Sequence, residues 1–177
     1  MFSPTFVILF IFTLSAAARL QGGQGQMQSR GATTIVGQIV SADSTRDVGF
    51  CLGAESNEDG AAVAIVLCGD STPTFPNGNN TWVVPAAPLT GSITTFGNKC
   101  LDVTNGNAVN GQTLQIWTCT EGDTNQMFLA TNNAQIQWVG TNFCVDLTNG
   151  DTTPGNLIQI WDCAVPDNSN PNQVWIV

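Results

Sequence analysis

The sequence predicts an all-β fold in which three repeats pack around one shared core, and three observations support this. Residues 100–119 read CLDVTNGNAVNGQTLQIWTC and residues 144–163 read CVDLTNGDTTPGNLIQIWDC, so two stretches of equal length agree at ten of their twenty positions. A third pair of cysteines encloses CLGAESNEDGAAVAIVLC at residues 51–68. Short apolar segments alternate with clusters of Gly, Asn, Asp and Pro, which is typical of strands joined by tight turns. One repeat of this size cannot bury its apolar face alone, so the three copies are expected to form one barrel.

The N-terminal segment differs in composition from the rest of the chain. It begins with a short apolar run that is followed by the small residues Ala16–Ala18. This pattern is typical of a secretory signal peptide, and the run is shorter than the roughly 20 residues that span a bilayer. We therefore expect a signal peptide at residues 1–18 and a secreted, extracellular protein. Residues 19–33 are rich in Gly and Gln and are expected to form a flexible leader, which leaves residues 34–177 as one domain.

The remaining chain reads mostly as strands. Apolar and β-branched patterns predict strands at residues 34–40, 62–68, 113–119 and 156–163. Turn signals stand at Asn105-Gly106, Asn149-Gly150 and Pro76-Asn77-Gly78. With roughly four short strands in each copy, we expect about twelve strands in all. The repeats are expected at about residues 34–88, 89–133 and 134–177.

The cysteines indicate disulfides rather than a metal site. An even number of cysteines in a secreted chain is typical of disulfide bonds. Many pairings are open to six cysteines, and the repeat favours the one in which each copy closes on itself: Cys51–Cys68, Cys100–Cys119 and Cys144–Cys163. Zinc is not expected, because the sequence has no histidine and no pair of cysteines with CxxC spacing.

Charge and composition exclude several classes of function. The sequence has 4 Lys and Arg against 13 Asp and Glu, a net charge of −9. This charge argues against nucleic-acid partners and against anionic membrane surfaces, and no later segment is apolar enough for membrane insertion. Without histidine there is no Ser-His-Asp or Cys-His arrangement. Paired carboxylates could cleave glycosides, but Asp102 and Asp146 belong to separate repeats, so we expect neither enzyme activity nor a cofactor.

Each closing cysteine is followed by an amide side chain and a large aromatic residue. The three segments are NNTW at residues 79–82, TNQMF at 124–128 and PNQVW at 171–175. The combined pattern, C-x-D, then Q-x-W-x-C, then N-Q-x-[WF], resembles the repeat of ricin B-type lectins, which also serve as carbohydrate-binding modules. The resemblance covers residues 34–177 and implies a β-trefoil. It also implies that the closing aromatics Phe128 and Trp175 belong to the core.

Two repeats carry the groups that sugar recognition needs. A sugar offers hydroxyl groups and an apolar C–H face, which require a carboxylate, an amide and a flat aromatic surface. The second repeat has Asp102, Trp117 and Asn125, and the third has Asp146, Trp161 and Asn172.

The resemblance assigns a role to each residue. It implies that the carboxylate accepts hydrogen bonds from adjacent sugar hydroxyls, that the tryptophan stacks on the pyranose and that the asparagine completes the contacts. Gln126 and Gln173 are implied to support the aspartates. Gln115 and Gln159 are included as site residues, although they fit a role as backbone anchors equally well. Galactose and N-acetylgalactosamine are the ligands that the resemblance implies.

Other interpretations accompany this assignment. The two aspartates could instead cap turns with Thr104 and Thr148, and Trp138, which has no counterpart in the repeat, is expected to be packed. In the first repeat Gly53 replaces the aspartate and Ala64-Ile65-Val66 replaces Q-I-W. We therefore expect no sugar site there.

The linker between the closing cysteine and the asparagine is longer in the third repeat than in the second. It contains Pro166 and Pro171, so the third site is expected either to differ in specificity or to be blocked. Asn79 begins a glycosylation sequon in the first repeat.

The expected partners are glycans or glycoconjugates, and a homodimer is compatible with the sequence. The alternative function is a β-trefoil protease inhibitor or protein-binding effector without sugar binding. Such a protein would have no reason to keep the Asp, Trp and Asn set twice.

Overall fold

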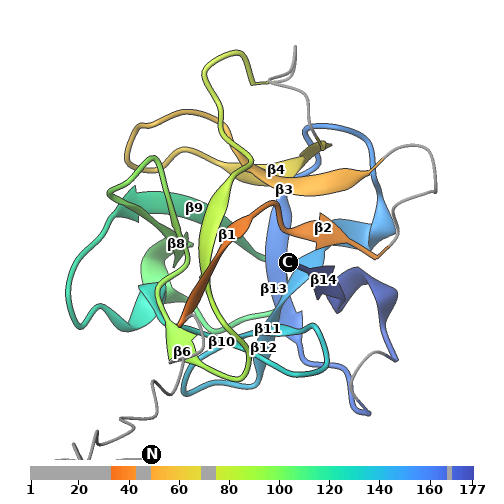
Figure 1. The fold of residues 1–177 in the computed structure, drawn as a ribbon. Coiled ribbons are helices and arrows are strands. Elements are labelled where there is room, and N and C mark those ends of the chain that lie inside the picture. The colour runs from red at the N-terminus through yellow and green to blue at the C-terminus, as the bar shows by residue number, and fades with distance from the viewer. Residues whose placement is uncertain (1–32, 43–48, 69–74, 167–168) are drawn as a thin grey trace, which may run out of the picture. The chain divides into compact units, whose positions relative to one another are not determined.

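The computed structural model describes residues 33–42, 49–68, 75–166 and 169–177 (Figure 1). The chain divides into two units, residues 1–30 and 31–177, and all the described residues belong to the second. The expected signal peptide and almost all of the expected leader lie outside the described residues. No helix in the described part of the chain is long and apolar enough to cross a membrane.

The described residues form short strands and four 3-10 helices. The first repeat contains β1 (Thr34–Gly37), β2 (Val40–Ser41), β3 (Phe50–Ala54), β4 (Val63–Leu67) and β5 (Trp82–Pro85). The second contains β6 (Thr90–Gly91), β7 (Thr94–Thr95), β8 (Lys99–Val103), η1 (Thr104–Gly106), β9 (Gln112–Thr118), η2 (Thr124–Gln126) and β10 (Phe128–Ala130). The third contains β11 (Ile136–Trp138), β12 (Phe143–Leu147), η3 (Thr148–Gly150), β13 (Ile158–Asp162), η4 (Pro171–Gln173) and β14 (Trp175–Ile176).

The prediction of an all-β fold with threefold repetition is confirmed. Three of the four predicted strands correspond to β4, β9 and β13, with ends that agree within two residues. The fourth, residues 34–40, is two strands instead of one, β1 and β2. The chain turns inward between them, because Ile39 is completely buried there.

One hairpin in each repeat has the same register and the same disulfide. In β3–β4, β8–β9 and β12–β13 the opening cysteine pairs with the residue two positions before the closing cysteine. The structure contains the bridges Cys51–Cys68, Cys100–Cys119 and Cys144–Cys163. Because each bridge joins the two strands of one hairpin, residues opposite each other in the strands keep a fixed spacing.

Three glycine amides connect the repeats in a ring. The N–H of Gly60 donates to the carbonyl of Ile116 at 2.9 Å, that of Gly111 to Ile160 at 3.0 Å and that of Gly155 to Ile65 at 2.9 Å. The third bond returns from the last repeat to the first, so the ring is closed. All three glycines have positive φ (84°, 88° and 97°), a conformation that residues with a Cβ adopt only under strain. The three isoleucines that accept these bonds are completely buried.

The closing aromatic residues complete the core. Trp82, Phe128 and Trp175 are each at most 2% exposed. They begin β5, β10 and β14, and each of these strands pairs with a strand of the next repeat around the barrel, respectively β7, β11 and β2. The indole N–H of Trp82 donates to the carbonyl of Leu52, and that of Trp175 to Val145, both at 2.9 Å. The strands that begin at these aromatics therefore join neighbouring repeats, while the two indole bonds anchor each ring within its own repeat.

We predict that Gly111→Ala destabilises the protein by about 1–2 kcal/mol, because a Cβ is strained at this positive φ. The nearest atom to that Cβ is 3.8 Å away, so strain rather than a clash is the cause. Urea unfolding measures the change. Gly37→Ala is the matched control: its φ is outside the strained range and its Cβ would have no neighbour within 4 Å. A loss at Gly111 no larger than at Gly37 would contradict the need for glycine at this positive φ.

Candidate functional site

A buried carboxylate in the second repeat receives one hydrogen bond on each oxygen. Asp102 lies on β8 opposite Gln115 on β9 and is 4% exposed. Nε2 of Gln115 donates to Oδ1 at 2.8 Å, and Nε2 of Gln126 donates to Oδ2 at 3.2 Å. The two amides therefore orient the carboxylate and leave its other lone pairs for a further donor.

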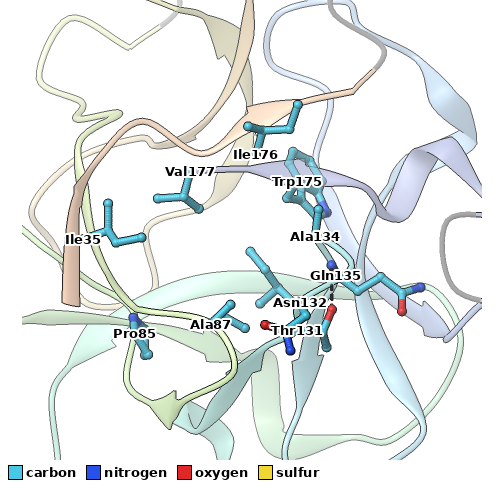
Figure 2. Close-up of a pocket in the computed structure, with 12 residues that line it drawn as sticks. Ile35, Pro85, Ala87, Thr131, Asn132, Ala134, Gln135, Trp175, Ile176 and Val177 are labelled. Atoms are coloured by element: carbon cyan, nitrogen blue, oxygen red, sulfur yellow. Dashed lines mark hydrogen bonds between the residues drawn. The ribbon is translucent and has the colours of Figure 1, made fainter. Parts of the chain in front are cut away.

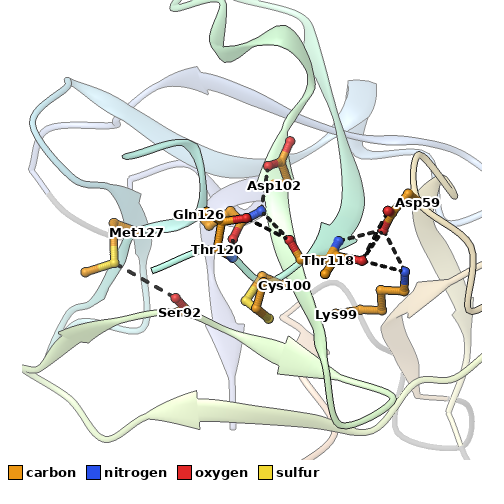
Figure 3. The surroundings of a disulfide bond; sticks show 10 residues. Asp59, Ser92, Lys99, Cys100, Asp102, Thr118, Thr120, Gln126 and Met127 are labelled. Atoms are coloured by element: carbon orange, nitrogen blue, oxygen red, sulfur yellow. Dashed lines mark hydrogen bonds and ion pairs between the residues drawn. A yellow bond between two sulfur atoms is a disulfide. The ribbon is translucent and has the colours of Figure 1, made fainter. Parts of the chain in front are cut away.

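The amide of Gln126 is itself held in one orientation. Its Oε1 accepts the backbone N–H of Thr120 at 3.0 Å, and its Nε2 also donates to the carbonyl of Thr118 at 3.3 Å. Figure 3 shows this arrangement beside the Cys100–Cys119 bridge. Because the residues on both sides of the closing cysteine bind Gln126, the glutamine must present its N–H groups to Asp102.

The third repeat contains the same arrangement. Nε2 of Gln159 donates to Oδ1 of Asp146 at 2.9 Å, and Nε2 of Gln173 donates to Oδ2 at 3.2 Å. Gln173 accepts the N–H of Ala164 at 2.8 Å and donates to the carbonyl of Asp162 at 2.9 Å. The expected supporting glutamines and the two ambiguous ones, Gln115 and Gln159, thus all donate to an aspartate.

The two tryptophans of the Q-I-W triplets point outward. Trp117 is 44% exposed and Trp161 is 43% exposed, because each follows an inward-facing isoleucine on its strand. In the β-ladder, Trp117 lies opposite Cys100 and Trp161 lies opposite Cys144, two residues before the aspartate in each case. Had both indoles been buried in the core, neither could have served as a stacking surface for a sugar ring.

The two predicted asparagines pack against glycines of the neighbouring turn. A Cβ on Gly106 would lie 2.6 Å from Oδ1 of Asn125, and a Cβ on Gly150 would lie 3.0 Å from Oδ1 of Asn172. The Asn-Gly turn after each aspartate is therefore needed for the close approach of the asparagine.

These groups surround a shallow cavity in the third repeat. Its volume is about 200 Å³, and it is lined by Asp146, Asn149, Gln159, Trp161, Asn170 and Asn172. All the lining residues except the tryptophan are polar. Among the described residues, no group of three or more His, Cys, Asp or Glu side chains is placed to hold a metal ion.

Asn149 and Asn170 line this cavity but were not among the predicted site residues. Asn170 stands two positions before Asn172, and its counterpart before Asn125 is Asp123. Extending the comparison of the closing segments by one residue toward the N-terminus would have revealed this position. Asn149 belongs to the Asn-Gly turn, which the sequence indicated as a turn without showing that its side chain faces the site.

The pair Asp123 and Asn170 makes the two sites electrostatically different. Both side chains cap a 3-10 helix: Oδ1 of Asp123 accepts the N–H of Asn125 at 3.0 Å, and Oδ1 of Asn170 accepts that of Asn172 at 3.1 Å. Asn170 also donates to Oδ2 of Asp146 at 3.4 Å. The third site therefore has an additional amide donor where the second has an additional negative charge.

Both site carboxylates have raised pKa values. Burial raises the pKa of Asp102 above its ordinary value of 3.8, the hydrogen bonds from its two glutamines oppose the rise, and the charge of Asp123 adds to it. Burial also raises the pKa of Asp146, against hydrogen bonds from its two glutamines and Asn170. Raised carboxylate pKa values in a solvent-accessible cleft are typical of functional sites.

The first repeat has no room for the same arrangement. Val66 occupies the register position of the two tryptophans, opposite Cys51, and Gly53 that of the aspartates. A Cβ on Gly53 would lie only 2.7 Å from a methyl group of Val66. The side chain of Val66 therefore fills the space that the carboxylate takes in the other repeats.

The alternative interpretations have the following outcomes. The aspartates bind glutamines and do not cap the turns, and the hydroxyl of Thr148 donates to the carbonyl of Leu157 at 2.7 Å. Trp138 is 5% exposed and donates to the carbonyl of Thr124 at 2.8 Å, so it is packed. Asn79 of the sequon is half-buried, and its Nδ2 donates to Oγ1 of Thr95 at 3.0 Å.

A further cavity, of about 240 Å³, lies between the N-terminal and C-terminal strands (Figure 2). Apolar residues such as Ile35, Pro85, Trp175 and Val177 form most of its lining. None of its lining residues is Asp or Glu, and the side chain of Gln135 points away from Ile35 and Val177 in Figure 2. Its chemistry thus differs from that of the two aspartate sites.

Comparison with protein families gives one match. A family model described as the ricin-type beta-trefoil lectin domain matches residues 89–177, which contain the second and third repeats. No curated protein matches the chain significantly.

Solved structures share the fold. The designed threefold-symmetric protein ThreeFoil has a TM-score of 0.61 at 20% identity, covering 79% of this chain and 95% of that one. The C-terminal half of an earthworm R-type lectin, in complex with GalNAc, has 0.57 at 15%, covering 80% and 95%. A non-toxic homologue of type II RIPs from Momordica charantia (bitter gourd), in complex with α-methyl-D-galactoside, has 0.57 at 19%; 82% of this chain covers 48% of that one, about half its length. These likenesses show that the fold is a β-trefoil.

We predict that Asp123→Asn lowers the pKa of Asp102 while leaving that of Asp146 unchanged, because only Asp102 feels the charge that is removed. Carboxyl ¹³C NMR titration resolves the two groups. The raised pKa values have a consequence for folding: each carboxylate stabilises the folded state below its unfolded pKa of about 3.8, and this contribution is lost as the pH rises through the folded value. An unchanged Asp102 pKa in the Asp123→Asn variant would rule out the charge of Asp123 as a cause of the raised Asp102 pKa.

Proposed function

Because the chain belongs to the family of ricin-type β-trefoil lectin domains, we propose that it is a carbohydrate-binding lectin with sites for galactose- or N-acetylgalactosamine-type glycans in its second and third repeats. One observation carries the proposal. Three features occur together twice. They are a buried carboxylate held by two glutamine amides, an outward tryptophan on the partner strand and an asparagine against a turn glycine.

The hydrogen-bond inventory of the site matches the chemistry of a galactoside. An ionised carboxylate accepts about four hydrogen bonds, and its glutamines use two of them. At Asp102 the remaining lone pairs suit two hydroxyls of one sugar, and an axial hydroxyl places two neighbouring hydroxyls within reach of one carboxylate. At Asp146 the bond from Asn170 uses a third position, which a sugar hydroxyl could replace. The indole then covers the apolar face of the ring, and the rigid frame reduces the entropy lost on binding.

The charge distribution favours neutral glycans. The protein carries a net charge of −9, and each site contains a carboxylate. Lys99 is the one Lys or Arg side chain among the described residues, and it is ion-paired with Asp59 at 2.6 Å. An anionic sugar would meet uncompensated negative charge at either site, so sialylated or sulfated galactosides should bind more weakly than neutral ones.

Two sites on one domain allow binding to clustered glycans. Linked engagement of two weak sites raises the apparent affinity by roughly 10²–10⁴ when both can be reached at once. A role in binding multivalent glycoconjugates outside the cell follows, without a catalytic step. Three disulfides within the described residues fit an oxidising, extracellular location, and the N-terminal signal peptide remains part of this proposal.

We predict that Asp102→Ala and Asp146→Ala each remove one site, with a loss of about 1–3 kcal/mol because a hydrogen-bonding partner is lost from the site. The double variant should lose binding to immobilised galactosides and remain folded, since two unfavourably buried charges are removed. NMR titration with methyl α-D-galactoside separates the sites, because the indole N–H signals of Trp117 and Trp161 report them individually.

Methyl α-D-glucoside, which lacks the axial hydroxyl, is the control ligand for this experiment. Binding by the double variant at wild-type strength would refute the site assignment. No response to any galactoside, combined with inhibition of a protease, would favour the alternative function of an inhibitor.

We predict opposite effects for two tryptophans of the third repeat. Trp161→Ala should abolish binding at that site and change the stability by less than about 1 kcal/mol, because the indole is exposed. Trp175→Ala should destabilise the fold by about 3–5 kcal/mol, because its indole is buried in the core. Thermal unfolding and galactoside titration measure both effects, and a large stability loss for Trp161→Ala would assign that residue to the core instead.

A further inference from the structure

We propose that Asp59 and Asn110 are positioning residues. Each of them fixes the backbone next to the exposed tryptophan of the following repeat, Trp117 and Trp161 respectively. The first repeat, which has no sugar site, would thus serve the site of the second, and the second would serve the third. The inference rests on the proposed function, because it concerns the affinity of those two sites.

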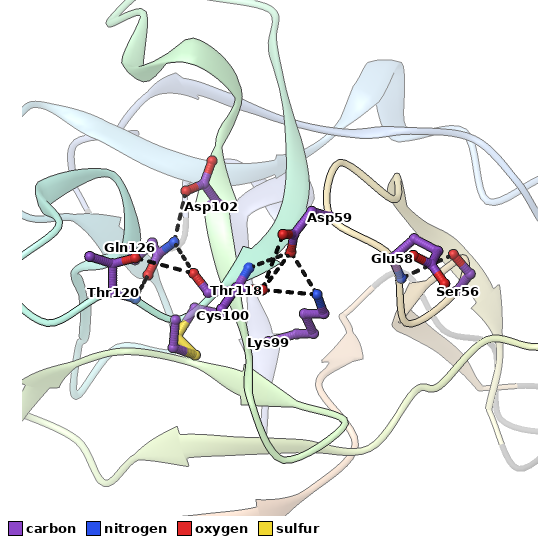
Figure 4. Close-up of polar contacts among 10 residues, drawn as sticks. Ser56, Glu58, Asp59, Lys99, Cys100, Asp102, Thr118, Thr120 and Gln126 are labelled. Carbon is purple, nitrogen blue, oxygen red and sulfur yellow. Dashed lines mark hydrogen bonds and ion pairs between the residues drawn. A yellow bond between two sulfur atoms is a disulfide. The ribbon is translucent and has the colours of Figure 1, made fainter.

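Asp59 holds the residue that follows Trp117. Its Oδ1 accepts the backbone N–H of Thr118 at 2.6 Å and the Thr118 hydroxyl at 2.9 Å. Lys99 donates to the same oxygen at 2.6 Å and lowers the pKa of Asp59 below its ordinary value. Figure 4 shows Asp59 on one side of Thr118 and the Gln126–Asp102 pair on the other. Thr118 is therefore bound from both sides, by its N–H and by its carbonyl.

Asn110 makes the equivalent contact one repeat further on. Its Oδ1 accepts the N–H of Asp162 at 2.7 Å, and its Nδ2 donates back to Oδ2 of Asp162 at 2.9 Å. Asp162 follows Trp161 as Thr118 follows Trp117. The carbonyl of Asp162 also accepts a hydrogen bond from Gln173. The peptide after each tryptophan is thus held between the preceding repeat and the site's own glutamine.

The position of these residues explains how they act. Asp59 and Asn110 stand directly before Gly60 and Gly111, whose amides bind the carbonyls of the isoleucines before the tryptophans. The side chains of Asp59 and Asn110 each add a further hydrogen bond between the repeats, directly next to the glycine-to-isoleucine bond. The backbone on both sides of the tryptophan is therefore fixed by two consecutive residues of the preceding repeat.

The indole of Trp117 lies beside Gly60. A Cβ at Gly60 would lie 3.6 Å from Cζ3 of Trp117, so the ring passes next to this backbone. A stacking surface that is fixed before the sugar arrives loses less entropy on binding.

The remaining junction lacks both the acceptor and the tryptophan. Pro154 precedes Gly155, and its side chain has no hydrogen-bonding atom. The strand that Gly155 binds carries Val66 at the tryptophan position. The side-chain acceptor therefore accompanies the tryptophan at two junctions and is replaced together with it at the third.

The test measures one site at a time. In an Asp146→Ala background, Asp59→Ala should weaken methyl α-D-galactoside binding at the second site about three- to tenfold, the effect of one lost hydrogen bond. Asp59→Asn keeps the acceptor and should restore at least half of the affinity. In an Asp102→Ala background, Asn110→Ala should weaken the third site by a similar factor.

Two controls separate positioning from stability. Lys99→Met removes the ion pair and the hydrogen bond from Lys99 to the Thr118 hydroxyl at 3.0 Å, but it leaves the Asp59 acceptor for the Thr118 N–H. Pro154→Ala alters the junction without a tryptophan. Neither should change affinity by more than twofold. Amide hydrogen exchange of Thr118 should accelerate in Asp59→Ala and stay slow in Asp59→Asn. This readout holds without any ligand, so it remains informative if the protein binds no galactoside.

A lower unfolding temperature for Asp59→Ala with unchanged affinity would overturn the proposal, as would equal weakening by Lys99→Met. Unchanged Thr118 exchange would also overturn it. Absence of galactoside binding by the unmodified protein would instead refute the proposed function.

Discussion

The ring of three glycine-to-isoleucine hydrogen bonds is the constraint on which the rest of the structure depends. It fixes the isoleucine of each central strand toward the core. In β9 and β13 the alternation of a β-strand then places the flanking glutamine and tryptophan on the opposite face. The hairpin register places the aspartate opposite that glutamine. One backbone contact per repeat therefore decides which side chains can meet at the surface, and the disulfides keep the hairpins in this register.

The site carboxylates show how the fold maintains unfavourable groups. Burial raises the pKa values of Asp102 and Asp146, which means that the ionised forms are less stable here than in water. Four glutamine amides offset part of this effect, and backbone groups on both sides of the closing cysteines hold two of those amides. The stability of the core and of the closed ring is what allows two such carboxylates to stay in place for a ligand.

Much of this arrangement could be predicted from the sequence because it is repeated. The doubled spacing of Cys, Asp, Gln, Trp and Asn indicated the hairpins, the bridges and the residues that come together around Asp102 and Asp146. Contacts between repeats could not be predicted, since Asp59 and Asn110 differ in residue type and act on residues 59 and 52 positions later, respectively. The break between β1 and β2 was missed because the burial of Ile39 follows from tertiary packing rather than from the alternation pattern. Asn170 was missed because the comparison of the closing segments began one residue after it.

Val66 has an evolutionary consequence. In the first hairpin its methyl groups lie against the bare backbone of Gly53, so any side chain introduced at Gly53 meets them before it reaches solvent. Introducing an acid at that position would first require a change at Val66, and a change at Val66 alone would bring no function. A sugar site in the first repeat thus demands coordinated changes at Gly53 and Val66, with an intermediate that gains no function.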